Sequence, residues 1–166
     1  METYCKWCTA NLGDVSDGDH SITYGLCSDC SKRITSTGVL LKEYIDLFNA
    51  PILVLNGEGL MCSANDMAFK TLGTDLPTIT GQPPGMAWEC VHAREPEGCG
   101  NTVHCQSCAI RIALNDTMET GKSHLKVPAY PDVMLKEKVK KVEFLISTEK
   151  VADVVLLRID GLRSVC

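Results

Sequence analysis

The apolar residues of the chain change their spacing several times, and each spacing predicts a different element. Between residues 38 and 49, the sequence GVLLKEYIDLFN places them on one wide face of an amphipathic helix. The segment SANDMAFKTLG predicts a shorter helix, which begins at Ser63 or Asn65 and ends at Gly73. After Cys108, the segment AIRIALNDTMETG repeats apolar residues at helical spacing and predicts a third helix.

Runs in which apolar residues cluster or alternate predict strands before and after these helices. The runs are PILVL, LMC, VEFLIS and DVVLLRID. Asn56 and Gly57 separate the first two runs and are typical of a tight hairpin turn. The segment SHLKVPAYPDVML predicts a further strand, which Pro128 and Pro131 confine to a sheet edge or force to bend. Helices and antiparallel strands in this order predict an α+β domain.

The chain contains ten cysteines, and eight of them fall into two quartets. The first quartet consists of Cys5, Cys8, Cys27 and Cys30. Two C-x2-C pairs at this separation are typical of structural zinc sites, in which two sharp turns bring four sulfurs around one ion. A unit of residues 1–37 is too short to fold on its own apolar core, so we expect zinc to stabilise it. A redox-active C-x2-C pair and disulfides are the alternatives.

The second quartet consists of Cys90, Cys99, Cys105 and Cys108. Proline and glycine residues between the first two predict a tight loop, and the helical spacing that follows places the last two in the first turn of a helix. The partial positive charge of a helix start favours thiolates, which are the form that binds metal. We expect this quartet to bind zinc or an iron–sulfur cluster, which spacing alone does not separate. Disulfides and packing as reduced thiols are the alternatives.

Polar residues lie among these four cysteines and are candidates for a supporting role. They are His92, Glu95, His104 and Gln106. Two interpretations are open, because such residues either tune a metal cluster or are ordinary loop residues. His104 directly precedes Cys105 and is also a candidate to replace a cysteine as a metal ligand.

Composition and charge narrow the functional classes. The chain is 45% apolar and 22% charged, which is typical of a globular protein. Its net charge of −5 argues against sequence-independent binding of nucleic acid, and we interpret the basic run 136–141 as a solvated turn and strand edge. The first residues lack the apolar segment of a secretory signal, and no apolar run approaches the roughly 20 residues of a membrane span. We therefore expect a cytoplasmic protein with mostly reduced thiols and no membrane partner.

The order of the predicted elements resembles a PAS domain over residues 38–162. The stretch ILVLNGEGLMCSANDMAFKTLG resembles the strand–turn–strand opening of that family, with Asn65 at the helix start, and TGQPPGMAWECVHA resembles its glycine-led connection between short helices. Residues 90–108 resemble a cysteine-rich insertion, GCG followed by C-x2-C, in a subgroup of bacterial sensor proteins. The segment CKWCTANLGDVSDGDHSITYGLCSDCSKRI resembles the zinc-ribbon-like modules that accompany bacterial signalling proteins.

These resemblances imply a PAS-like five-stranded antiparallel sheet with flanking helices, preceded by a small zinc-ribbon-like module. The expected organisation is a module at 1–37, a linking or dimerisation helix at 38–49, and a PAS-like domain at 50–166 that carries the insertion. The wide apolar face of the helix leaves two interpretations open. It packs within its own domain, or it also meets a second copy of the chain.

The resemblance to PAS domains implies signal sensing through ligand binding or dimerisation. We expect a metal-containing sensor or adaptor whose input is redox state, oxygen or metal at the second quartet. Its output would pass by contact with protein partners, and we expect a homodimer. One alternative is a zinc-stabilised interaction module without a sensing role.

Enzymatic chemistry and an organic cofactor are less favoured by the sequence. Four cysteines around one metal leave no open position, and no Ser–His–Asp, HExxH or P-loop pattern occurs. A thiol-dependent enzyme built on Cys62 is the remaining enzymatic alternative, although a strand position favours simple packing. A haem or flavin is disfavoured because only 5% of residues are aromatic and Ala109–Thr120 contains no histidine.

Overall fold

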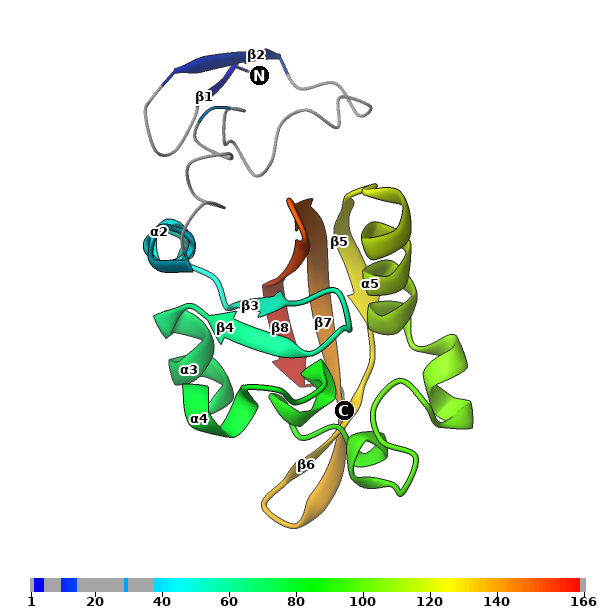
Figure 1. The fold of residues 1–166 in the computed structure, drawn as a ribbon. Coiled ribbons are helices and arrows are strands. Elements are labelled where there is room, and N and C mark those ends of the chain that lie inside the picture. Colours follow the sequence, from blue (N-terminus) through cyan, green and yellow to red (C-terminus); the bar gives the residue numbers. More distant parts are fainter. Residues whose placement is uncertain (1, 5–9, 15–28, 30–37, 165–166) are drawn as a thin grey trace.

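The computed structural model describes residues 2–4, 10–14, 29 and 38–164 (Figure 1). Near the N-terminus, strands β1 (Glu2–Tyr4) and β2 (Asn11–Asp14) pair antiparallel. Cys5, Cys8, Cys27 and Cys30, the expected zinc ligands of the zinc-ribbon-like module, lie outside the described residues. Within the described ranges, no helix has the length and apolar character needed to cross a membrane.

The main domain is built on one antiparallel sheet of six strands, in the order β4-β3-β8-β7-β5, with β6 paired to β7 beside this path. The strands are β3 (Ile52–Leu55), β4 (Met61–Ala64), β5 (His124–Ala129), β6 (Asp132–Leu135), β7 (Lys138–Val151) and β8 (Val154–Ser164). The predicted antiparallel α+β architecture is therefore confirmed. Five strands had been expected. The sixth arises because the segment with Pro128 and Pro131 forms two strands instead of one, and the long β7 pairs with both.

Helices and short turns of 3-10 helix surround this sheet (Figure 1). They are α2 (Gly38–Ile45), α3 (Asp66–Leu72), α4 (Leu76–Ile79), η1 (Pro84–Met86), η2 (Val91–Arg94), η3 (Val103–Ser107) and α5 (Ala109–Thr120). The predicted ends of α3 are confirmed. Asn65 accepts a hydrogen bond from the N–H of Ala68 at the start, and Gly73 adopts φ 64° at the end. Helix α2 ends at Ile45, earlier than the predicted 49.

Apolar side chains fill both faces of the sheet, which explains why the run PILVL lacks polar residues. Leu53 and Leu55 belong to the larger core, which also contains buried residues of α5 and β7. Ile52 and Val54 point to the opposite face, where they pack with the end of α2. Alternate residues of β3 thus serve two cores, as the two-residue period of a strand requires.

Helix α2 packs within its own domain, as both interpretations of its wide apolar face require. Tyr44, Ile45 and Phe48 are buried against Val151 and Leu156 of the sheet. Contact between this helix and a second copy of the chain stays a prediction.

Candidate metal centre

The four cysteines of the second quartet line a single pocket of about 320 Å³. Cys90, Cys99, Cys105 and Cys108 reach it from the segment between η1 and α5, and the start of α5 and the connection from β5 to β6 line it as well. All four are free thiols, so the disulfide alternative does not describe this structure. Cys105 is buried, whereas the other three are partly exposed.

The backbone around these cysteines differs from the predicted helix start. Cys105 lies in η3, and Cys108 is the extended residue before α5, with φ −69° and ψ 114°. The prediction that both lie in the first turn of one helix is therefore wrong. The cause is local, because the side chain of Thr102 accepts the N–H of His104 and starts a separate 3-10 turn.

The first cysteine is fixed to the sheet. Glu89, directly before Cys90, adopts φ 54°, a conformation that residues other than glycine rarely take. The backbone of Cys90 forms a bridge with Val133 of β6, and the N–H of Met134 donates to the carbonyl of Glu89 at 3.0 Å. The start of the cysteine-rich segment is thereby held against the β6 strand.

Hydrogen-bond donors contact the sulfurs of Cys99 and Cys105. The backbone N–H of Gly100 donates to Cys105 Sγ at 3.1 Å, and Thr102 Oγ1 lies 3.3 Å from the same sulfur. The guanidinium of Arg111 donates to Cys99 Sγ at 3.3 Å. Such contacts stabilise a negatively charged sulfur, as a metal-bound thiolate requires.

The pKa values of two of these thiols depart from the ordinary value in opposite directions. Burial acts to raise the pKa of Cys105, but hydrogen bonds from Thr102 and Gly100 and the charge of Arg111 outweigh it, so this pKa is lowered. Burial raises the pKa of Cys90, and its neighbours Cys99 and Cys108 raise it further, against the opposing effect of backbone hydrogen bonds. The pocket thus favours a thiolate at Cys105 and disfavours an uncompensated one at Cys90.

Gly85, which lines the pocket, leaves space for two of the cysteines. A methyl group added at Gly85 would lie 2.9 Å from Cys99 Sγ and 3.3 Å from Cys90 Cβ. Only glycine leaves room for both cysteines at this point.

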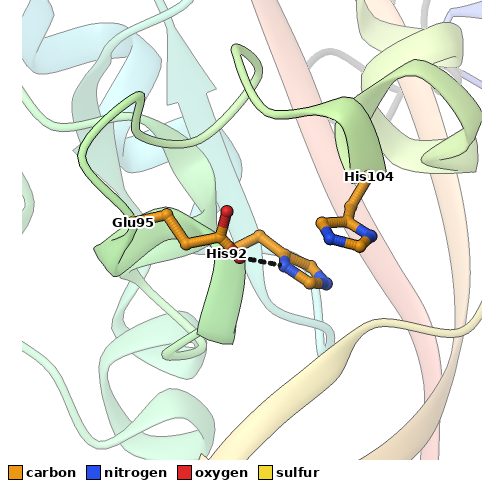
Figure 2. A group of neighbouring side chains, drawn as sticks. All are labelled: His92, Glu95 and His104. Carbon is orange, nitrogen blue, oxygen red and sulfur yellow. Dashed lines mark hydrogen bonds and ion pairs between the residues drawn. The ribbon is translucent and has the colours of Figure 1, made fainter.

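The most compact group of ligand-type side chains in the described residues is not made of cysteines. It consists of His92, Glu95 and His104, whose donor atoms all lie within 4.8 Å of one another (Figure 2). The sequence placed these residues among the cysteines and left their role open. Their proximity depends on how the loop between η2 and η3 folds back, for which the sequence carries no local signal.

The cysteines outside the two quartets do not join this site. Cys62 lies on β4 with its thiol near the carbonyl of Val54, and the pocket does not include it. Cys166 is outside the described residues.

Comparisons with known proteins identify the fold. No family model matches the chain, and no curated protein matches it either. Among solved structures, it is similar to a variant of RsLOV, at a TM-score of 0.51 and 11% identity over 83% of this chain and 69% of the other. The PAS domain of Bordetella pertussis BvgS gives a TM-score of 0.46 and 17% identity, over 77% of this chain and 85% of that domain. The PAS domain of nitrogen regulation protein NR(II) from Vibrio parahaemolyticus gives a TM-score of 0.45 and 13% identity, over 76% of this chain and 98% of that domain.

Likeness at these identities concerns the fold alone. The antiparallel sheet with α3, α4 and α5 against it agrees with the order of elements expected from the sequence. The chain therefore adopts a PAS-like α+β fold, with a cysteine-lined pocket ahead of its longest described helix.

Proposed function

We propose that the chain is a non-enzymatic sensor or adaptor of the PAS type, whose input is a metal centre on Cys90, Cys99, Cys105 and Cys108. One observation carries the proposal. Four free thiols that are spread over residues 90–108 line one pocket, with hydrogen-bond donors at the sulfur of Cys105 and a guanidinium at that of Cys99. Thiolate ligands select zinc or iron–sulfur clusters over hard cations.

The spacing of the sulfurs supports an iron–sulfur cluster more than a single zinc ion. Four sulfurs about 2.3 Å from one zinc ion in a tetrahedron stand about 3.8 Å apart. In the described part of the chain, no three of these cysteines form a group with all sulfurs within 4.8 Å of one another. A cluster of iron and sulfide places its cysteine ligands around a larger volume, which suits sulfurs arranged around a pocket.

The surroundings of the sulfurs support a redox or oxygen input. Hydrogen bonds to the cysteine sulfurs, nearby charge and solvent access set the reduction potential of an iron–sulfur cluster. Here Gly100 and Thr102 contact Cys105 Sγ, and Arg111 contacts Cys99 Sγ. A change of one charge unit in the pocket would act directly on Arg111, which belongs to α5.

The remaining expectations belong to the same proposal. We expect zinc at Cys5, Cys8, Cys27 and Cys30, on the strength of their spacing. Output by contact with a signalling protein, or with a second copy in a homodimer, is supported by the exposure of Leu47 just after α2, at 54%. Sedimentation of a Leu47→Glu variant tests the dimer, because a charge at an apolar contact would shift it towards monomer.

The experiment is metal analysis of the full chain purified without oxygen. We expect iron and sulfide with visible absorbance, and zinc in addition from the first quartet. Cys99→Ser and Cys105→Ser should lose the iron and the absorbance, while Cys62→Ser, a change outside the pocket, should keep both. A colourless protein with zinc at the second quartet would show that this centre holds zinc and not an iron–sulfur cluster. Unchanged metal content in both pocket variants would refute the metal centre itself.

A further inference from the structure

His92, Glu95 and His104 form a second cluster of metal-ligating side chains beside the cysteines (Figure 2). His92 lies in η2, Glu95 caps the end of that turn, and His104 lies in η3. His92 Nδ1 is 2.7 Å from Glu95 Oε1, and the two imidazole rings are stacked with centroids 4.0 Å apart and an interplanar angle of 17°.

The backbone holds these three residues in place. The N–H of Glu95 donates to the carbonyl of His92 at 3.3 Å, which fixes their separation on one short turn. The N–H of His104 donates to Thr102 Oγ1 at 3.2 Å, and Thr102 is itself buried. The histidines are therefore carried by two anchored turns that face each other across the loop.

We propose that His92, Glu95 and His104 bind a divalent transition-metal ion of the zinc, cobalt, nickel or ferrous iron class, at a site separate from the cysteine centre. Two imidazoles and one carboxylate are the donor set that such borderline ions prefer. Magnesium and calcium need mostly oxygen ligands, of which this group supplies only one residue. The single negative charge of Glu95 compensates part of the charge of the ion.

Two side-chain rearrangements would let the group admit the ion. Two ligand atoms about 2.1 Å from one ion stand about 3.4 Å apart at a tetrahedral angle. The distance between His92 Nδ1 and Glu95 Oε1 would increase from its present 2.7 Å, because each group would bind the ion and no longer contact the other. The His104 ring would turn out of the stack so that a nitrogen lone pair points to the same centre.

The site would exchange its ion with solvent more readily than the cysteine pocket. The side chain of His92 is 22% exposed and that of Glu95 is 38% exposed, whereas Cys105 is buried. Three protein ligands also leave one or more positions for water or another ligand. Both histidines line the pocket of the four cysteines, so the two sites would share one cavity. The inference goes beyond the proposed function and does not rest on it, since its ligands are nitrogen and oxygen.

The test is equilibrium dialysis of the as-purified full chain against cobalt(II), with iron, zinc and visible absorbance measured in the same samples. His104→Ala and Glu95→Gln should each bind one equivalent of cobalt less than the unmodified chain, or bind it at least about tenfold more weakly. Glu97→Gln is the matched control, because Glu97 lies on the same loop but outside the cluster. It should bind as much cobalt as the unmodified chain, and circular dichroism should be the same for all four proteins.

Two results would overturn the inference. One is equal cobalt binding by the unmodified chain and both cluster variants. The other is a joint loss of cobalt and of the iron or zinc held by the cysteines, which would make His104 part of the cysteine centre. A Cys99→Ser, Cys105→Ser chain that still loses cobalt on mutation of His104 would support this site, whereas unchanged metal content in those two cysteine variants would contradict the proposed function alone.

Discussion

Replacement of Asn65 should strongly destabilise the domain, although it removes few atoms. Its side chain is fully buried and makes four hydrogen bonds, all to backbone groups. Oδ1 accepts the N–H groups of Ala68 and Ile52, each at 2.9 Å. Nδ2 donates to the carbonyls of Ile45 at 2.9 Å and Ala50 at 2.8 Å. One amide thus joins the end of α2, the start of β3 and the start of α3.

The expected cost of Asn65→Ala follows from these four bonds. Loss of the helix cap costs about 1 kcal/mol of unfolding free energy. The N–H of Ile52 and the carbonyls of Ile45 and Ala50 would each lose a buried or partly buried hydrogen-bond partner. Each loss costs about 1 kcal/mol or more of unfolding free energy. We therefore expect Asn65→Ala to lower the unfolding free energy by about 4 kcal/mol, a large part of the 5–15 kcal/mol typical of a domain. Asn65→Ser keeps a capping oxygen and should lose about 1 kcal/mol less.

Urea unfolding followed by far-ultraviolet circular dichroism measures this loss. The matched control is Asn56→Ala, because Asn56 also accepts two backbone N–H groups, but in a solvent-accessible turn. Water replaces those lost partners, so the control should lose about 1 kcal/mol or less. If Asn65→Ala unfolds within about 1 kcal/mol of the unmodified chain, the assignment of this amide as the joint between the three elements is wrong. If the alanine variant does not fold, Asn65→Ser provides the measurement.

Three further changes test the pocket and the packing around it. Gly85→Ala should lower the metal content at the cysteines several-fold, because the added methyl would lie 2.9 Å from a cysteine sulfur, whereas Gly57→Ala meets nothing within 4 Å and should have no effect. In metal-free protein, Cys105 should be alkylated at lower pH than Cys90. The pKa of Cys105 is lowered and that of Cys90 is raised, so Cys105 becomes a thiolate first as pH rises towards the ordinary cysteine pKa of about 8.5. Mass mapping that shows the reverse order of alkylation would contradict the assigned contacts. Thr117→Val should lower the unfolding free energy, measured with urea, by about 1–3 kcal/mol. It removes hydrogen bonds from α5 to the carbonyl of Lys122 and to a buried hydroxyl of β7. An unchanged unfolding midpoint would count against these two bonds.

The parts of the fold that depend on local chemistry could be predicted from the sequence. The caps of α3 at Asn65 and Gly73 are local signals, because each acts on the backbone within a few residues. The inward residues Phe144 and Ile146 followed from alternation along a single strand. The order of helices and strands was enough to indicate the PAS-like fold.

The parts that depend on distant contacts could not be predicted in this way. The turn between β6 and β7 uses Lys136 and Glu137 at φ 49° and 65°, and neither is a residue that normally indicates such a turn. The position of Cys105 was misplaced because a 3-10 turn, capped by Thr102, precedes α5. That four cysteines share one pocket was expected from their number and spacing, but the pairing of His92 with His104 requires the path of the loop.

The backbone bridge between Cys90 and Val133 connects the cysteine-rich segment directly to the β6–β7 hairpin. If the proposed metal centre gains or loses its metal and that segment moves, the movement must either break this bridge or displace β6 as well. The hairpin exposes two apolar side chains, Leu135 at 43% and Val139 at 59%. A change at the proposed metal centre would in this way alter an exposed apolar surface of the β6–β7 hairpin, which a neighbouring protein could contact.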